Sequence, residues 1–485
     1  MDWTLILKIT YGIIVPIVCL RVIYDTNHIS KTLSYLLLVI FVPFFGIIFY
    51  FSFGVNYRNR KIYSKKLFIN IQFEEKLEIQ LQHYAKQIIK NKGALLESNK
   101  KLIRLLFKDI SSPLTNKNEV DLLINGEQKF PEVFKALEAA KHHIHIEYYV
   151  FTEDIIGRKI EALLIKKAKE GVQVKFMYDD YGSSSIRKSL VYRLREAGIE
   201  AYPFYKIKLI YLANRMNYRN HRKIIVIDGR VGFVGGINVS DRYTNDIKTS
   251  IFPFWRDTHL KIQGPAVWYL QYLFLCDWNF CADCELEPED HFFPNLDTFK
   301  TTSNVAVQIA ASGPDSPSPT ILYSLLQAIS LAQEEILITT PYFVPNESIM
   351  DALCIAAMSG VKVKLLVPRV SDSRIVNAAA SSYYTELLES GVQIYRYTKG
   401  FIHSKTTTID NEIAIVGSAN MDMRSFDLNF EVNAIVYDRD INKQLKDAFY
   451  NDLNDADEID LERWMERSWY HELSEKIARL LSPLL

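Results

Sequence analysis

The stretch 220–228 reads NHRKIIVID, and the stretch 402–410 reads IHSKTTTID. Each contains a histidine, a lysine two positions later and an aspartate five positions after the lysine. The two sets are His221, Lys223 and Asp228, and His403, Lys405 and Asp410. Histidine supplies only 10 of the 485 residues, so chance does not explain this matched spacing. The chain therefore carries one polar motif twice.

The repetition extends well beyond the motif. A glycine follows each histidine by 14 positions, an asparagine follows each aspartate by 10, and an arginine follows each asparagine by four. These residues are Gly235, Asn238 and Arg242, and then Gly417, Asn420 and Arg424. Upstream of each motif, strand-like runs such as VQVKFMYDD and VKVKLLVPR alternate with helix-like runs. The sequence therefore predicts an α/β fold built from two tandem α/β/α repeats that pack about a pseudo-twofold axis.

The strand pattern separates the three motif residues into two groups. In an extended strand, residues i and i+2 lie on one face, so the histidine and lysine of each motif point together. Asp228 begins the dipeptide DG and Asp410 begins DN, each between two apolar runs. Such dipeptides favour hairpin turns. We therefore expect the histidine and lysine to meet substrate and the aspartate to hold the turn.

These side chains suit chemistry at a phosphate group. An imidazole acts as a nucleophile or as a general acid and base near neutral pH. The lysines and the amides of Asn238 and Asn420 can donate hydrogen bonds to phosphate oxygens. If both repeats converge on one phosphorus atom, one histidine attacks while the other protonates the leaving oxygen. The lysines and asparagines hold the phosphate charge, so we expect no metal ion and no other cofactor.

The N-terminal 57 residues differ from the rest of the chain. No charged side chain stands between Thr32 and Tyr57, and a bilayer is crossed by about 20 apolar residues. The sequence predicts a transmembrane helical hairpin over residues 1–57, with helices at about 4–24 and 33–54. NYRNRKIYSKK follows, with five basic residues and no acidic one. By the positive-inside rule, this multi-pass protein would hold its catalytic part on the cytoplasmic side of the cell membrane.

The rest of the chain divides into three predicted parts. Residues 58–118 form a helical, membrane-proximal linker, residues 119–300 the first repeat, and residues 301–485 the second repeat with C-terminal helices. The 57 basic and 57 acidic residues balance, which argues against nucleic acid as a partner. Cys276, Cys281 and Cys284 lack a fourth ligand for zinc, and five cysteines in a chain of this length indicate reduced thiols.

The segments HRKIIVIDGRVGFVGGIN and HSKTTTIDNEIAIVGSANMDMRS resemble the paired HxKxxxxD motifs of the phospholipase D superfamily. The apolar N-terminal segment, HIEYYVFTEDIIG, WRDTHLKIQGPAV, TPYFVP and ARLLSPLL are similar to bacterial cardiolipin synthases. The resemblance covers nearly the whole chain, and both motifs are intact. It implies two phospholipase D-like repeats that act as a metal-independent phosphatidyltransferase.

The resemblance also implies a substrate and a set of roles. One phosphatidylglycerol would give its phosphatidyl group to a histidine and release glycerol, and a second would accept that group to form cardiolipin. His221 is expected to be the nucleophile and His403 the acid and then the base, although the near-symmetry of the motifs leaves this order open. In relatives, carboxylates downstream of each motif orient the imidazoles, and the matching residues are Asp257 and Glu431.

Other functions remain open at this point. A phospholipase D-type hydrolase, or a transferase that uses another alcohol, would carry the same motifs. A phosphodiesterase acting on nucleic acid fits less well, because of the apolar segment and the balanced charge. The sequence does not indicate the oligomeric state.

Overall fold

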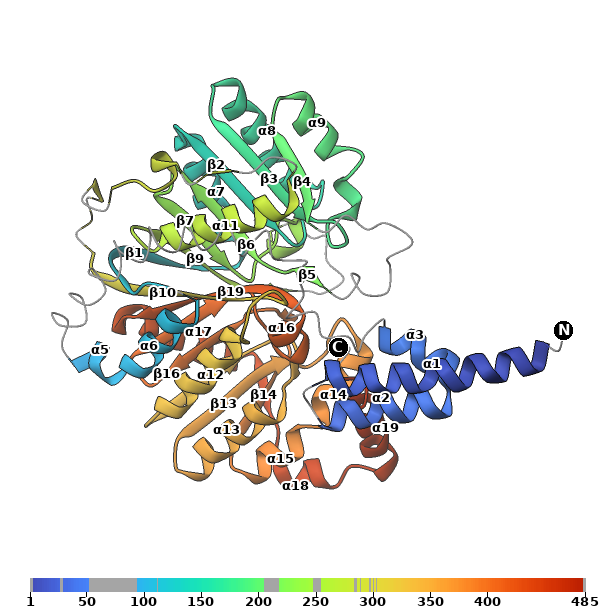
Figure 1. Cartoon of the computed structure of the whole chain (residues 1–485). Helices are drawn as coiled ribbons and strands as arrows, with labels where there is room; N and C mark the ends of the chain where they lie inside the picture. Colours follow the sequence, from blue (N-terminus) through green and yellow to red (C-terminus); the bar gives the residue numbers. More distant parts are fainter. Residues whose placement is uncertain are drawn as a thin grey trace.

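The computed structural model describes residues 3–26, 29–51, 94–110, 112–204, 218–246, 254–282, 286–287, 289–295, 298–299, 301 and 303–482. Its centre is a 16-stranded mixed sheet that both repeats build together (Figure 1). The first half contributes β1 (Thr115–Ile124), β2 (His143–Tyr148), β3 (Gln173–Asp179), β4 (Glu200–Phe204), β6 (Lys223–Ile227), β7 (Val231–Gly235) and β9 (Thr258–Gln263). The second half contributes β10 (Val305–Ser312), β11 (Glu335–Thr339), β13 (Lys362–Pro368), β14 (Gln393–Tyr397), β16 (Thr406–Ile409), β17 (Ile413–Gly417), β19 (Asn429–Tyr437) and β20 (Ala456–Glu458). The sixteenth strand is β5 (Arg219–Asn220) of the first half, which pairs with β19 beside the main path of the sheet.

The two halves meet where β1 and β10 pair in antiparallel fashion. Outward from this pair, the first half runs β1-β9-β7-β6-β2-β3-β4 and the second runs β10-β19-β17-β16-β11-β13-β14, with β20 at the edge. Apart from β20, each of these strands has a counterpart at the same place in the other half, which relates the halves by an approximate twofold axis. The prediction of tandem α/β repeats is confirmed, and the repeats share a continuous sheet.

Helices cover both faces of the sheet. One face carries α11 (Val267–Cys281) and α17 (Arg439–Leu453), which share a single apolar core with strands of both halves. On the other face each half has its own core. The helices there are α7 (Asn125–Ala139), α8 (Ile155–Lys169) and α9 (Leu190–Glu196) on the first half, and α12 (Thr320–Leu331), α13 (Glu347–Met358) and α15 (Tyr384–Glu389) on the second.

The described part of the predicted linker is not separate from the catalytic body. Helices α5 (Ala94–Ser98) and α6 (Lys100–Ile110) place Leu96, Leu102 and Leu106 in the core of the second half. Residues 58–93, with their basic segment, lie outside the described residues. Strand β1 (Thr115–Ile124) crosses the boundary at 119 that was predicted between the linker and the first repeat.

The N-terminal segment forms three helices, α1 (Trp3–Asp25), α2 (Ile29–Phe41) and α3 (Pro43–Phe49). The second helix of the predicted hairpin is broken at Val42, because Pro43 lacks an N–H group and disfavours a helical conformation at the residue before it. A Cβ at Gly46 would lie 2.3 Å from the Leu38 carbonyl oxygen, so α3 packs tightly on α2. Within the described ranges, none of the helices combines the length and the apolar character that a bilayer crossing requires.

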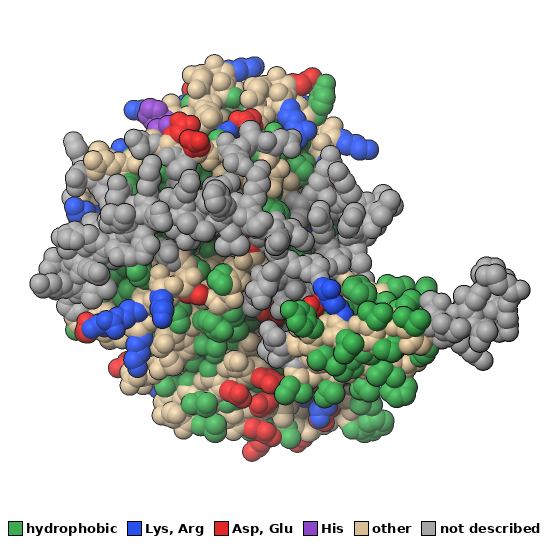
Figure 2. Space-filling view, viewed as in Figure 1, with side chains coloured by type: hydrophobic (Ala, Val, Ile, Leu, Met, Phe, Trp, Pro, Cys, Tyr) green, Lys and Arg blue, Asp and Glu red, His purple; other side chains and the backbone are tan. Residues whose placement is uncertain are grey.

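The N-terminal helices contact the catalytic body through a small apolar cluster that includes Tyr218 and Leu428. Their outward side chains are apolar and exposed, and Figure 2 shows them as a dense patch at this end of the molecule. They include Ile13, Ile17, Leu20, Phe41, Phe44 and Phe45.

The two motif aspartates lie in hairpin turns, at the far ends of β6 and β16 from the histidines. Both have left-handed backbone conformations, with φ of 53° at Asp228 and 51° at Asp410. The carboxylate of Asp228 accepts three backbone N–H groups, those of residues 141–143, at the start of β2. That of Asp410 accepts the N–H groups of residues 333–335 at the start of β11. Each carboxylate therefore fixes the start of a neighbouring strand.

This geometry predicts a graded loss of stability at Asp410. Asp410→Ala removes three backbone hydrogen bonds and should lower the free energy of unfolding by about 2 kcal/mol. Asp410→Asn keeps an oxygen that can accept from the N–H groups of Glu334 and Glu335, which lie 2.8 and 2.9 Å from it. Asparagine also tolerates a left-handed backbone, so the free energy of unfolding should fall by less than half as much as in Asp410→Ala. Denaturant unfolding of both variants measures the difference. An equal loss in both would contradict this role.

Candidate active site

Two short parallel strand pairs bring the two halves together at the motifs. Strand β5 (Arg219–Asn220) pairs with the start of β19, and β15 (Phe401–Ile402) pairs with β8 (Trp255–Arg256). His221 and Glu431 come directly after the paired residues of β5 and β19, and His403 and Asp257 come directly after those of β15 and β8. The His221 N–H donates to the carbonyl of residue 430 at 2.9 Å, and the His403 N–H donates to that of residue 256 at 2.7 Å.

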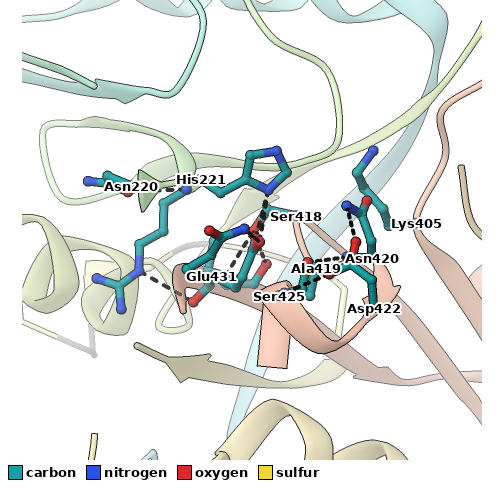
Figure 3. A network of polar contacts seen from close by, with 12 residues as sticks. Asn220, His221, Lys405, Ser418, Ala419, Asn420, Asp422, Ser425 and Glu431 are labelled. Carbon is teal, nitrogen blue, oxygen red and sulfur yellow. Dashed lines mark hydrogen bonds and ion pairs between the residues drawn. The ribbon is translucent and has the colours of Figure 1, made fainter. Parts of the chain in front are cut away.

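Each imidazole is bonded to a carboxylate from the other half. Nδ1 of His221 lies 2.9 and 3.0 Å from the two oxygens of Glu431, as Figure 3 shows. Nδ1 of His403 lies 2.7 Å from Oδ2 of Asp257. A carboxylate only accepts hydrogen bonds, so Nδ1 carries the proton in each neutral ring. Nε2 of each ring keeps its lone pair for chemistry. The sequence indicated both carboxylates, and the structure adds that the pairs are crossed between the repeats.

The two carboxylates are held in different ways. Glu431 accepts hydrogen bonds from the Ser418 hydroxyl at 2.5 Å and from the Asn429 amide at 3.1 Å. Gly236 occupies the place in the first half that Ser418 has in the second, eight residues after the motif aspartate. A Cβ at Gly236 would lie 2.2 Å from Oδ1 of Asp257, so only glycine leaves room for that carboxylate.

The two motif lysines are buried beside the histidines. Nζ of each donates to the carbonyl oxygen of the histidine two residues earlier, so both members of a motif lie together. Burial lowers the pKa of Lys223 to about 7 and that of Lys405 to about 8. The charge of Lys405 lowers the pKa of Lys223 further. In Figure 3, Lys405 and His221 extend toward the same side of the site.

Both imidazoles are neutral at neutral pH. Burial lowers the pKa of His221 to about 4 and that of His403 to about 3. The charges of Lys223 and Lys405 also lower the pKa of both rings. Glu431 raises the pKa of His221 and Asp257 raises that of His403, but neither offsets the effect of burial. Burial alone would raise the pKa of Glu431, but the hydrogen bonds and positive charges around it hold that pKa below its usual value. A bound phosphate anion would raise the pKa of both histidines, so one of them could then carry a proton.

The predicted phosphate-binding asparagines already have partners. The amide of Asn238 donates to the Tyr243 hydroxyl at 2.6 Å. The amide of Asn420 donates to Asp422 at 3.0 Å, and Asn420 lies beside Lys405 in Figure 3. Each amide nitrogen has a second N–H group that could donate to a phosphate oxygen.

Sequence reasoning missed the residues that surround the two histidines. The ring of Tyr149 lies 4.9 Å from that of His221, and the charges of Arg219 and Arg424 act on the pKa of its hydroxyl. His403 instead has aromatic neighbours, with Trp255 at 5.5 Å and Phe401 and Tyr243 at 5.9 Å between ring centroids. A signal was present in the sequence, because the residue two positions before the histidine is arginine in one motif and phenylalanine in the other.

The crossed bonds predict a specific response to neutralising one carboxylate. In Glu431→Gln, the charge-assisted bond to His221 becomes a neutral one, so the Nδ1–H proton resonance of His221 should move upfield while that of His403 stays in place. Asp257→Asn should show the reverse. Proton NMR with labelled histidine measures both. A change at His403 alone in Glu431→Gln would refute the crossed arrangement.

Comparisons with known proteins agree with this geometry. A family model described as cardiolipin synthase, phospholipase D-like domain, matches residues 133–252 and 325–453, and one described as phospholipase D-nuclease N-terminal matches residues 13–54. The chain is 43% identical over 456 residues to a cardiolipin synthase of a Geobacillus species, which covers 94% of this chain and 89% of that one. It is 40% identical over 463 residues to the major cardiolipin synthase ClsA of Bacillus subtilis, covering 95% of each chain.

A solved structure supports the fold alone. The crystal structure of phosphatidylserine synthase from Haemophilus influenzae matches 79% of this chain and 98% of its own, with a TM-score of 0.58 at 14% identity. The family model matches a part of each repeat, and the relatives match this chain over almost its whole length. The chain belongs to the cardiolipin synthase family of phospholipase D-like enzymes.

Proposed function

We propose that this enzyme transfers a phosphatidyl group from one phosphatidylglycerol to a second one, giving cardiolipin and glycerol. The observation that carries the proposal is the pair of crossed imidazole–carboxylate bonds, which leaves two Nε2 lone pairs beside two buried lysines. The relatives named cardiolipin synthase support the lipid substrate, because their identity to this chain extends over almost its whole length.

In the first step, Nε2 of His221 attacks the phosphorus of the donor lipid. The P–O bond to the headgroup glycerol breaks as the P–N bond forms, and protonated His403 gives its proton to the leaving oxygen. The lysines Lys223 and Lys405 hold the non-bridging oxygens, whose negative charge in turn favours the protonated form of His403.

In the second step, the glycerol hydroxyl of the acceptor lipid takes the place of the released glycerol. His403, now neutral, removes the hydroxyl proton while the oxygen attacks phosphorus and the P–N bond to His221 breaks. This restores the neutral His221 and the protonated His403 with which the cycle began. Glu431 keeps the His221 proton on Nδ1 throughout, so the same nitrogen attacks and leaves.

Burial lowers the pKa of both imidazoles to a similar extent. The assignment of His221 as the nucleophile therefore rests on the resemblance to the superfamily, in which the first-motif histidine attacks. The motif aspartates act on this site only through the strands that they anchor.

The N-terminal helices are proposed to anchor the enzyme in the membrane that holds its substrate. Their exposed apolar side chains support this proposal, and residues 13–54 match the family model described as phospholipase D-nuclease N-terminal. The basic segment that would set the catalytic part on the cytoplasmic side lies outside the described residues.

The test of the function is a reconstitution with a single lipid. Full-length enzyme in vesicles with labelled phosphatidylglycerol alone should form cardiolipin and glycerol in equal amounts. Phosphatidic acid as the main product would show a hydrolase, and a requirement for an added alcohol would show another transferase. His221→Ala and His403→Ala should each abolish turnover of this lipid.

An activated donor separates the two histidines in the same experiment. With a p-nitrophenyl phosphatidyl ester, the leaving group needs no proton, so His403→Ala should release p-nitrophenol once and retain a phosphatidyl group on the peptide that contains His221. His221→Ala should release none. An adduct on His403 in the His221→Ala variant would reverse the assignment.

The lysines predict an alkaline limb in the pH profile. An ammonium group is charged below its pKa, so kcat/KM should fall as the pH rises through about 7, the pKa of Lys223. In Lys223→Arg the guanidinium stays charged, so the limb should move toward about 8, the pKa of Lys405. Rates on phosphatidylglycerol in detergent micelles measure the profile. A limb that stays in place in Lys223→Arg would contradict this assignment.

A further inference from the structure

The last described helix has its polarity reversed. Helix α19 (Trp469–Arg479) packs on α14 (Arg374–Ser381) through a polar and small-residue face. Arg467 forms a bidentate ion pair with Glu475 at 2.9 and 3.0 Å, and Arg479 lies 4.2 Å above the ring of Tyr383. Ala478 is the buried apolar residue of the helix. The face toward the protein is therefore one that an ordinary surface helix would turn to water.

The opposite face of α19 is apolar and faces outward. Its exposed side chains are Trp469 at 72%, Tyr470 at 57%, Leu473 at 48% and Ile477 at 56%, followed by Leu480 at 78% and Leu481 at 41%. At 100° per residue, these six fall within an arc of about 120°, opposite the arc that holds Glu475, Ala478 and Arg479. An apolar stripe of this kind on a surface marks a site of interaction.

The position of α19 indicates what the stripe contacts. Helix α14, on which α19 packs, also contacts β12 (Phe343–Val344), and β12 pairs with β18 (Met421–Asp422). Helix α16 (Met423–Asp427) follows β18, and the next residue, Leu428, packs against the N-terminal helices. Helices α19 and α1–α3 thus lie against the same part of the second half (Figure 1), and Figure 2 shows apolar side chains over this region.

We propose that α19 lies in the lipid–water interface, with its apolar stripe in a phospholipid bilayer, as a second membrane contact beside α1–α3. The amphipathic rings of Trp469 and Tyr470 suit the headgroup level, and Lys476 can reach lipid phosphates from the flank of the stripe. Two membrane contacts, one from α1–α3 and one from α19, would fix the orientation of the catalytic body at the bilayer. The inference rests on the proposed transfer between membrane lipids.

Trp469 reports on this contact without any need for turnover. Among the described side chains it is the exposed tryptophan. Full-length enzyme in vesicles that contain brominated phospholipid should show quenched fluorescence, and Trp469→Phe should remove part of that quenching. Equal quenching in the wild type and in Trp469→Phe would overturn the proposal.

The stripe should also matter for activity at a membrane and not elsewhere. In Leu473→Ser/Ile477→Ser, kcat/KM on phosphatidylglycerol in vesicles should fall by about tenfold, while turnover of a short-chain, monomeric phosphatidylglycerol stays unchanged. The matched control is Ile355→Ser/Met358→Ser, which changes two exposed apolar residues of α13 and should alter neither rate.

Three outcomes distinguish the possible failures. Equal vesicle rates for the α19 variant and the control would overturn the proposal. Conversion of a dimer to a monomer by the α19 variant, with no change in lipid quenching, would assign the stripe to a second copy of the chain and overturn it too. A wild-type enzyme that makes no cardiolipin from the short-chain lipid would refute the proposed function instead, while the quenching result would still stand.

Discussion

The hydrogen bond between each imidazole and a carboxylate of the other repeat is the interaction on which the site depends. It fixes the tautomer of both rings, so Nε2 is the nitrogen of each ring that keeps a lone pair. It also requires that the halves be placed accurately, because a small shift would break both bonds together. The continuous sheet and the two short parallel strand pairs supply that placement through backbone hydrogen bonds.

The same burial that places these groups also sets their charge states. Lys223 and Lys405 would be fully charged at neutral pH in water, and in the site their pKa values lie close to neutral. A phosphodiester anion relieves the repulsion between them, so substrate binding stabilises the charged form of the site. Positive charge is thus concentrated at the proposed phosphate site, although the chain as a whole has equal numbers of acidic and basic residues.

Much of this could be predicted from the sequence, because local patterns carried the information. The repeated spacing predicted two equivalent α/β halves, and the DG and DN dipeptides predicted turns at Asp228 and Asp410. The crossed pairs could not be predicted, since they depend on which strand of one repeat lies beside which strand of the other. Pro43 was a local signal for the break at Val42, but the long run of uncharged residues favoured one continuous membrane helix. The outward direction of the apolar face of α19 could not be predicted, because a sequence pattern shows that a helix has an apolar face but does not show whether that face packs on the protein.

The unequal surroundings of the two histidines have a consequence for how such a site can evolve. Two identical copies of one repeat, related by an exact twofold axis, would give both histidines the same neighbours and the same basicity. Fusion into one chain removes that constraint, so serine can stand at position 418 while glycine remains at 236, and glutamate can pair with one ring while aspartate pairs with the other. Covalent duplication therefore lets a symmetric scaffold acquire a direction, because each side of the site can change without the other.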